Sequence, residues 1–301
     1  MKKAFPGHFS NDPRNLEDIW GRCIFVLDTN VLLNLYRYSD ETRSELLETF
    51  RLLKERLWIP YQVASDYFAN RVSVIGEQVK VYERAINNIS ELRQSLESQR
   101  QHPFVQKSTL IESTASFEKI ISELTENQKK FLRKIEFDDI KDSLEVLLDG
   151  RVGRGLRDEE VSEILSIGAK RYAQKRPPGY MDANKLKSDS EVISEKLKPY
   201  ADYVVWRQTI AMATAEALPV IFVTGDRKND WWSVYNGKLL GPHPLLVEEF
   251  VNEVGQPFLM YLPEKFMQQA NGFLERETSQ SAVDEIVEIR SEELPTNIHT
   301  Q

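Results

Sequence analysis

Short apolar runs alternate with longer amphipathic stretches along this chain. Four runs have the length and composition of buried strands, namely CIFVLD (23–28), LWI (57–59), PVIFVT (219–224) and FLMYL (258–262). Between them, apolar residues recur at helical spacing, as they do over 46–53 after a predicted helix start at Ser39. Strands that alternate with helices predict an α/β fold whose central parallel sheet is covered on both faces.

Two long amphipathic stretches follow the second predicted strand. Apolar residues recur at spacings of mostly three and four in each: Ile75, Val79, Tyr82, Ile86, Ile89 and Leu96, then Phe117, Ile121, Leu124, Phe131 and Ile135. A short break at 102–104 separates the two stretches. We therefore expect an antiparallel helical hairpin whose apolar stripes pack against each other. This hairpin belongs to a helical insertion that we place at 75–176.

The segment after Leu274 is strongly acidic. It holds seven acidic residues against two basic ones and contains Pro295 but no aromatic residue. We expect 275–301 to be a mostly mobile tail, although its stretch 283–289 could dock on a partner. Without the tail and the insertion, what remains of 20–274 has the size of one ordinary α/β domain.

Composition excludes several classes of protein. With 41% hydrophobic and 29% charged residues, the 301-residue chain is neither fibrous nor disordered throughout. It has no apolar run long enough to span a membrane, so we expect no membrane partner. One cysteine, Cys23, and a basic N-terminus without an apolar core indicate a cytoplasmic location. The net charge of −8 at first argues against nucleic acid, but the tail carries most of it.

Two of the apolar runs end in an acidic residue. Asp28 closes the first run, and Asp226 follows the third. Because ligands gather at the carboxyl ends of parallel strands, these carboxylates can face each other there. Clustered carboxylates repel unless a cation neutralises them, and hard oxygen ligands suit Mg²⁺ or Mn²⁺. The pattern predicts metal-assisted hydrolysis. The alternatives are a helix N-cap for Asp28 and a turn residue for Asp226.

Two further acidic residues lie in apolar surroundings. Asp66 lies about one turn into the predicted helix that follows Pro60, and Asp202 begins an otherwise hydrophobic helix. A carboxylate that faces a core needs a partner. The alternatives are solvent exposure for Asp66 and an N-cap for Asp202.

These segments together resemble the PIN-like nuclease superfamily, and most closely its bacterial branch with a long helical insertion. The motifs that carry the resemblance are LDTNVLLNLYRYS, WIPYQVASDYFANR, RPPGYMDANK, YADYVVWRQ and VTGDRKNDWW, in this order over about 20–265. The resemblance implies a three-layer α/β/α sandwich whose acidic pocket binds Mg²⁺ or Mn²⁺. It also implies cleavage of phosphodiester bonds in RNA, or in single-stranded or flap DNA.

The resemblance also implies roles for individual residues. Asp28, Asp202 and Asp226 match the family's metal-binding acids, and Asp66 stands where related proteins usually have glutamate. Asp182 and Asp230 match accessory acids, with Asp230 included among the metal ligands. Asn30 and Thr224 fit the family's polar contacts.

Contacts to nucleic acid are expected from basic and aromatic residues around these acids. The basic candidates for phosphate contacts are Arg71, Arg176, Lys185, Arg207 and Lys228. The aromatic candidates for base stacking are Tyr180, Trp206, Trp231 and Trp232. The alternatives are a solvated surface for the basic residues and core packing for the tryptophans.

Two other functions compete with the nuclease. LDTNV and TGDRKND also resemble haloacid-dehalogenase-like phosphatases, although Asn30 stands where that family has its acid. A catalytically degenerate binding module would use the hairpin to contact a protein partner or a second copy of the chain. The resemblance to PIN-like proteins further implies a role as a toxin or in defence against phage.

Overall fold

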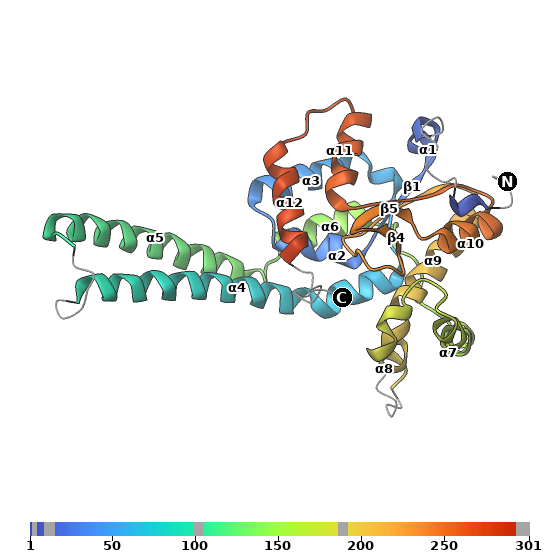
Figure 1. Ribbon diagram of the computed structural model, residues 1–301, viewed down its shortest axis with the longest axis horizontal. Coiled ribbons are helices and arrows are strands. Elements are labelled where there is room, and N and C mark those ends of the chain that lie inside the picture. Colours follow the sequence, from blue (N-terminus) through green and yellow to red (C-terminus); the bar gives the residue numbers. More distant parts are fainter. Residues whose placement is uncertain (2–4, 9–15, 99–104, 186–191, 293–301) are drawn as a thin grey trace. The chain divides into compact units, whose positions relative to one another are not determined.

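A computed structural model of the chain describes all residues except 2–4, 9–15, 99–104, 186–191 and 293–301 (Figure 1). The chain forms two compact units. The first comprises Met1–Tyr67 and Glu145–Gln301, and the second is Phe68–Leu144.

A four-stranded parallel sheet forms the centre of the first unit. Its order is β2 (Leu57–Trp58), β1 (Ile24–Leu27), β3 (Val220–Val223) and β6 (Phe258–Tyr261). Each strand is one of the four predicted apolar runs, and every residue of β3 is buried. Branched and aromatic side chains favour such strands because both faces of the sheet are covered. The sheet confirms the predicted parallel α/β architecture.

Aromatic side chains fill the layer on one face of this sheet. Phe25 of β1 contacts Trp20 and Phe266, with ring centroids 5.0 and 5.6 Å apart. The helices of this layer include α1 (Leu16–Arg22), α3 (Asp40–Leu52) and α11 (Pro263–Phe273). Ser39 caps α3, where the sequence predicts a helix start.

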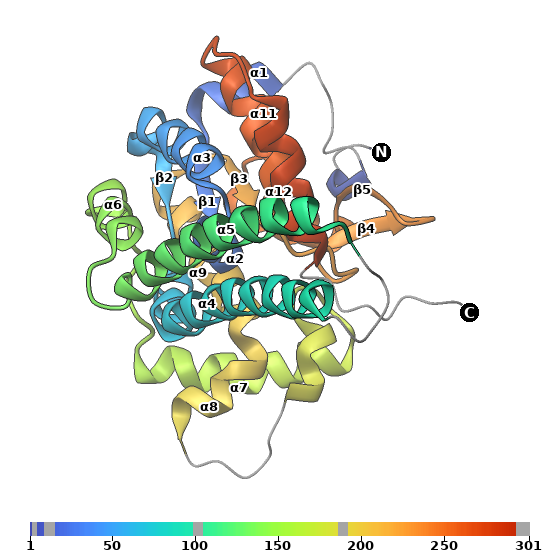
Figure 2. The ribbon, with the colours of Figure 1, turned by 90° about the vertical axis from the view of Figure 1, so that its left-hand side faces the viewer.

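A second aromatic cluster fills the opposite face. Trp206 packs against Phe258 of β6 with ring centroids 5.0 Å apart, and Phe222 of β3 stacks on Trp231. The helices here include α9 (Ala201–Glu216) and α10 (Pro244–Val254), which contact each other. Two helical layers around one sheet make the three-layer α/β/α sandwich that the sequence predicts, and Figure 2 shows the strands between them.

The first unit contains further helical elements. They are η1 (Pro6–His8), α2 (Thr29–Leu33), η3 (Asn34–Tyr36), η4 (Lys54–Arg56), α7 (Asp158–Ala173), η5 (Tyr180–Lys185), α8 (Ile193–Leu197) and η6 (Lys198–Tyr200). An antiparallel hairpin of β4 (Trp232–Tyr235) and β5 (Lys238–Pro242) was not predicted. Asn236 and Gly237 form its turn with φ of 49° and 73°, as an Asn-Gly turn allows.

The second unit contains the predicted helical hairpin. It includes most of α4 (Tyr61–Glu97), all of α5 (Lys107–Arg133) and the start of α6 (Asp139–Leu148). Tyr82 and Phe131 lie 5.8 Å apart between ring centroids, so the two apolar stripes meet. The unit ends at Leu144, earlier than the predicted end at 176, and beyond it Val152 pairs with Ile59 beside the sheet.

None of the described helices has an apolar stretch sufficient to cross a membrane.

The acidic C-terminal segment is largely ordered, contrary to the expectation of a mobile tail. Helix α12 (Gln280–Glu292) packs against α3 and α11 (Figures 1 and 2). Ala282, Val283 and Ile286 are buried because their spacing of one and three places them on one face of the helix. The stretch that could dock on a partner thus docks on its own chain.

Candidate active site

Two of the predicted acids follow neighbouring strands. Asp28 comes directly after β1, and Asp226 follows β3, which pairs in parallel with β1. Between them, the Thr224 hydroxyl donates a hydrogen bond of 2.6 Å to Asp28 Oδ2 and accepts one of 3.0 Å from the Asp226 N–H. The chain passes from β1 to β2 on one side and later to β3 on the other, so this is a topological switch point.

Asn30 connects the two strand ends a second time. Its Nδ2 donates to Asp28 Oδ2 over 2.7 Å, and its Oδ1 accepts from the Gly225 N–H over 2.7 Å. Asp28 also accepts from the Thr29 N–H through Oδ1 and caps α2. Asp28 therefore caps α2 and also belongs to the acidic cluster.

Asp202 joins the cluster from the first turn of α9. The indole Nε1 of Trp231 donates to its Oδ2 over 3.2 Å. Burial raises the pKa of Asp202 to about 7. Lys228 opposes that shift, whereas the negative charges of Asp226 and Asp28 add to it. Neighbouring carboxylates that raise one another's pKa lie in a site with unneutralised negative charge.

The pKa of Asp28 is also raised in this site. Burial raises its pKa, and the charge of Asp226 acts in the same direction. Hydrogen bonds from Thr224, Thr29 and Asn30 act in the opposite direction because they stabilise the ionised form.

Lys228 lies inside this acidic cluster. Its Nζ is 2.9 Å from Asp226 Oδ2 and 3.3 Å from Asp182 Oδ2, and its backbone N–H donates to Asp226 Oδ1 over 2.8 Å. Although burial opposes it, the charges of Asp226, Asp202 and Asp182 raise the pKa of the ammonium. Lys228 serves in this structure as a counter-ion to the acids, and its contact with phosphate stays a prediction.

Asp230 holds the loop that carries Asp182. Fully buried, it accepts hydrogen bonds through Oδ2 from the Gly179 N–H (3.0 Å) and the Met181 N–H (3.1 Å). Burial raises the pKa of its carboxyl group. Its Oδ1 has no hydrogen-bond partner among the described residues. The contacts of Asp230 are those of a loop anchor, whereas the sequence predicts a metal ligand.

Gly179 in this loop lies against the acidic cluster. Its φ is 87°, and a Cβ there would clash with the Tyr172 hydroxyl and lie 3.0 Å from Asp202 Cβ. Only glycine therefore lets the loop approach the first turn of α9 this closely.

Three of the four aromatic residues predicted to stack on bases are buried. Trp206, Trp231 and Trp232 have exposed fractions of 0%, 2% and 4%, so the stacking prediction is wrong for them and the packing alternative holds. Trp232 Nε1 donates to the Asp226 carbonyl over 2.6 Å, as Trp231 does to Asp202. The two indoles orient the acidic segments from the core. Tyr180 is half-buried.

Asp66 lies in the second turn of α4. It is half-buried, and Gln62 Nε2 donates to its Oδ1 over 2.9 Å. The charge of Asp226 acts on the pKa of Asp28, and the charges of Lys228, Asp226, Asp28 and Asp182 act on that of Asp202. The place of Asp66 among the metal ligands stays a prediction.

Three of the basic candidates form ion pairs within the chain. Arg71 pairs with Asp138, Arg176 with Glu249, and Arg207 with Glu253. The side chain of Lys185 lies outside the described part of the chain. Contacts of these residues with phosphate stay predictions.

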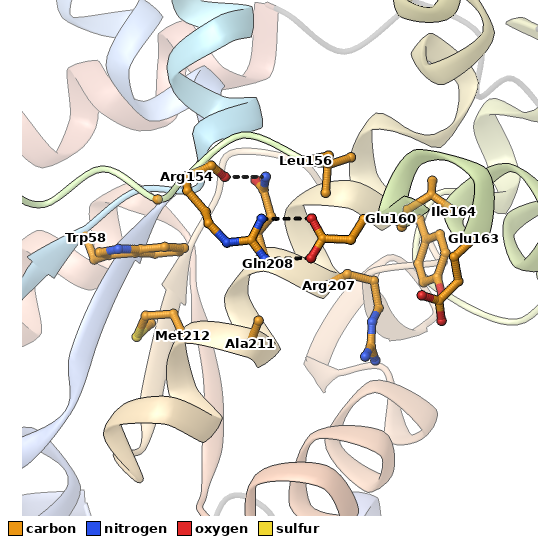
Figure 3. A pocket seen from close by; sticks show the side chains of 12 residues that line it. Trp58, Arg154, Leu156, Glu160, Glu163, Ile164, Arg207, Gln208, Ala211 and Met212 are labelled. Carbon is orange, nitrogen blue, oxygen red and sulfur yellow. Dashed lines mark hydrogen bonds and ion pairs between the residues drawn. The ribbon is translucent and has the colours of Figure 1, made fainter. Parts of the chain in front are cut away.

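A pocket of about 450 Å³ is lined in part by residues of α9, among them Arg207 and Met212 (Figure 3). Trp58 and Met212 form part of its wall, and Arg154 pairs with Glu160 at its rim. Arg207 also lines it, but none of the predicted acids does. The acids are therefore the better candidate for chemistry.

The donor set of the acidic cluster fits a divalent cation. Asp28, Asp182, Asp202 and Asp226 supply hard oxygen atoms, and Lys228 offsets only one of their charges. Among the described residues, however, no three acidic, histidine or cysteine side chains are already arranged as a metal site. The Lys228 ammonium lies 2.9 Å from Asp226 Oδ2, so a cation bound to that oxygen would compete with it.

Comparison with known proteins gives one match. The family model described as a PIN like domain matches residues 24–246, which include β1, β3 and the four acids of the cluster. No curated protein and no solved structure matches the chain.

Proposed function

The chain belongs to the PIN-like domain family, whose members are typically metal-dependent nucleases, and we propose that it hydrolyses phosphodiester bonds in RNA or in single-stranded or flap DNA. The observation that carries the proposal is the convergence of Asp28, Asp202 and Asp226 at the carboxyl edge of the sheet. The acids lie at the ends of two adjacent parallel strands and the start of one helix.

Asp28, Asp202 and Asp226 would hold Mg²⁺ or Mn²⁺, with Asp66 and Asp230 as the further ligands that the resemblance implies. When bound, such an ion activates water and stabilises negative charge on the phosphate. Thr224 and Asn30 fix the Asp28 carboxylate through hydrogen bonds of 2.6 and 2.7 Å. Trp231 fixes Asp202, so each ligand is held by a neighbour before any ion binds.

Lys228 is a cation within the acidic cluster. Its ammonium contacts Asp226 and Asp182. If a divalent ion neutralised Asp226, the Lys228 ammonium would be available for a phosphate oxygen, the role predicted from the sequence. Arg71, Arg176, Lys185 and Arg207 would guide the remainder of the nucleic acid without reading its sequence.

The test is a cleavage assay with three substrates: single-stranded RNA, single-stranded DNA and duplex DNA. Each is incubated with Mn²⁺ or with EDTA. We expect cleavage with Mn²⁺ alone, and its loss in Asp28→Asn and Asp226→Asn. Asp284→Asn, on the exposed face of α12, is the matched control and should cleave normally. Cleavage that survives Asp28→Asn or Asp226→Asn would overturn the mechanism.

The contacts of Asn30 argue against the phosphatase alternative. Both ends of its carboxamide form hydrogen bonds, and an amide has no proton to give to a leaving group. Hydrolysis of p-nitrophenyl phosphate with phosphate trapped on Asp28 would nevertheless favour it. Binding of Mn²⁺ without cleavage of any substrate would favour a degenerate binding module.

A biological role as a toxin or in phage defence follows only from the resemblance. We propose it in this form: expression of the chain arrests the growth of a bacterial host or reduces phage plaques. Expression of Asp28→Asn should do neither. If the wild type and Asp28→Asn had equal effects on growth or on plaques, the biological role would not depend on cleavage.

A further inference from the structure

Arg290 reaches the candidate active site from the last turns of α12. Its Nε and Nη2 donate to Glu264 over 3.1 and 2.6 Å. Glu264 lies in the first turn of α11, which follows β6, the neighbour of β3. The exposed fractions of the two side chains are 5% and 13%, so this ion pair is buried at the edge of the sheet that carries the acids.

The stem of Arg290 lies against Gly225, between Thr224 and Asp226. A Cβ placed on Gly225 would lie 3.7 Å from Arg290 Cδ and 3.2 Å from Asn30 Oδ1. Gly225 is thus enclosed between the arginine stem on one side and the Asn30 carboxamide on the other. Its own N–H donates to that carboxamide over 2.7 Å.

The ion pair with Glu264 does not use the whole guanidinium of Arg290. Its Nη1 is buried without a hydrogen-bond partner among the described residues. A buried unsatisfied donor costs free energy, and more so when it is charged. Costly groups of this kind concentrate at functional sites, which makes a role beyond the anchoring of α12 worth testing.

The contact with Gly225 continues to Asp28 through hydrogen bonds. Gly225 donates to Asn30 Oδ1, and Asn30 Nδ2 donates to Asp28 Oδ2. Thr224 Oγ1, next to Gly225, donates to the same carboxylate oxygen. A shift of Gly225 would therefore move two of the groups that orient Asp28.

We propose that Arg290 is a positioning residue for the active site: by packing on Gly225 while bound to Glu264, it holds the Gly225–Asn30 hydrogen bond and thereby the Asp28 carboxylate. Helix α12 lies beyond residue 246, where the family match ends, so the C-terminal segment completes the site from outside the matched region. The effect on cleavage rests on the proposed nuclease function.

Glu285 supplies a matched control on the same helix. It accepts hydrogen bonds from the Ser39 N–H, the Ser39 hydroxyl and the Thr42 hydroxyl, and so anchors α12 on α3. Glu285→Gln loosens the helix at this anchor but leaves Arg290 and Glu264 unchanged. An effect that comes only from loosening α12 should therefore appear both in Glu285→Gln and in a substitution of Arg290.

The experiment compares Arg290→Met, Arg290→Lys and Glu285→Gln in the full chain. Hydrogen exchange of the segment 223–228 is measured without metal, and kcat and KM are measured with Mn²⁺. In Arg290→Met we expect exchange at least tenfold faster in that segment, and kcat about 10- to 100-fold lower with KM within about twofold. Glu285→Gln should match the wild type in both measurements. Arg290→Lys keeps the charge but cannot form both hydrogen bonds to Glu264. Its exchange rate and kcat should lie between those of Arg290→Met and the wild type.

Two results would overturn the proposal. One is wild-type exchange and kcat in a folded Arg290→Met protein. The other is an equal change in Arg290→Met and Glu285→Gln, because it would make Arg290 only an anchor of the helix. If Arg290→Met does not fold, the same comparison is made between Arg290→Lys and Glu285→Gln. If the wild type cleaves nothing, the proposed function fails, while hydrogen exchange still decides whether Arg290 holds the segment.

Discussion

The Thr224 hydroxyl lies 2.6 Å from Asp28 Oδ2, so a side-chain hydrogen bond joins the ends of β1 and β3. Thr224 is fully buried, and its oxygen also accepts from the Asp226 N–H and from Asn30 Nδ2. This one hydroxyl therefore sets the positions of two acids that the chain supplies almost 200 residues apart.

Replacing this hydroxyl should impair catalysis more than folding. Thr224→Val keeps the shape but removes the donor to Asp28, so we expect kcat/KM for RNA cleavage to fall about 10- to 100-fold. Thr224→Ser keeps the hydroxyl and should stay within a few fold of the wild type. Steady-state kinetics with Mn²⁺ measure both variants. Equal activity of the valine and serine variants would show that the hydrogen bond is dispensable.

Asp230 offers a test between a loop anchor and a metal ligand. Asparagine at this position can still accept from the Gly179 and Met181 N–H groups, whereas alanine cannot. If Asp230 acts as an anchor, Asp230→Asn should retain most of the activity and Asp230→Ala should lose it. An Asp230→Asn variant as inactive as Asp226→Asn would show instead that the charge at residue 230 is needed.

Removal of the Lys228 charge should strengthen metal binding. The ammonium lies 2.9 Å from Asp226 Oδ2 and so competes with a divalent ion for that oxygen. We expect Lys228→Met to bind Mn²⁺ about tenfold more tightly by calorimetry, since an ion pair near a protein surface is worth roughly a few kcal/mol before solvation is counted. Lys228→Arg, which keeps the charge, is the control. Weaker Mn²⁺ binding by the methionine variant would contradict this competition.

The pKa of Asp202, about 7, makes the metal-free protein less stable as the pH rises. In an unfolded chain, the pKa of an aspartate is about 3.9. Between this pH and about pH 7, Asp202 therefore keeps a proton in the native state that it loses in the unfolded state. The stability that this proton contributes is present below about pH 4, is lost as the pH rises to 7, and stays lost above it. The slope is at most about 1.4 kcal/mol per pH unit.

Asp202→Asn removes this slope. In EDTA, urea unfolding at several pH values should show the variant gaining stability relative to the wild type from pH 5 to pH 8. Asp284→Asn, on the exposed face of α12, controls for the loss of a negative charge. A difference between Asp202→Asn and the wild type that does not change with pH would place the pKa of Asp202 near its ordinary value.

The buried pair of Arg171 and Glu249 should be essential for stability. Arg171 Nη1 and Nη2 donate to Glu249 over 2.6 and 2.8 Å, and Trp206 Nε1 donates to the same carboxylate. Although burial opposes it, Arg171 lowers the pKa of Glu249. Glu249→Gln leaves a buried guanidinium without its counter-charge, and we expect a loss of about 3–5 kcal/mol in urea unfolding. Glu248→Gln, the neighbouring substitution, should cost less than about 0.5 kcal/mol. Similar losses in both would contradict a special role for the pair.

Local patterns were sufficient to predict much of this fold. The four apolar runs became the four strands of the sheet, and the two striped stretches became the helical hairpin, because strand and helix periodicity are properties of neighbouring residues. The family match confirms the PIN-like resemblance that the ordered motifs carry. The Asn236-Gly237 turn is also a local sequence signal for the hairpin of β4 and β5.

The C-terminal segment shows why composition alone is misleading. Its charge and Pro295 predict mobility, yet Val283 and Ile286 lie on the buried face of α12. A helix that is too polar to be stable by itself becomes stable when its narrow apolar face meets a surface, here α3 and α11. That surface comes from residues more than 200 positions earlier and from α11 just before it.

The chemical groups of the site, and the strands and helices that carry them, follow from the amino-acid sequence. Their contacts emerge only in the folded chain: Lys228 pairs with Asp226, Trp231 and Trp232 donate to the acidic segments, and Asp230 accepts from the 179–181 loop. The physical reason is that a charge or a hydrogen bond acts over a few ångströms in space. Which groups come that close depends on how distant segments pack, and no local pattern records that.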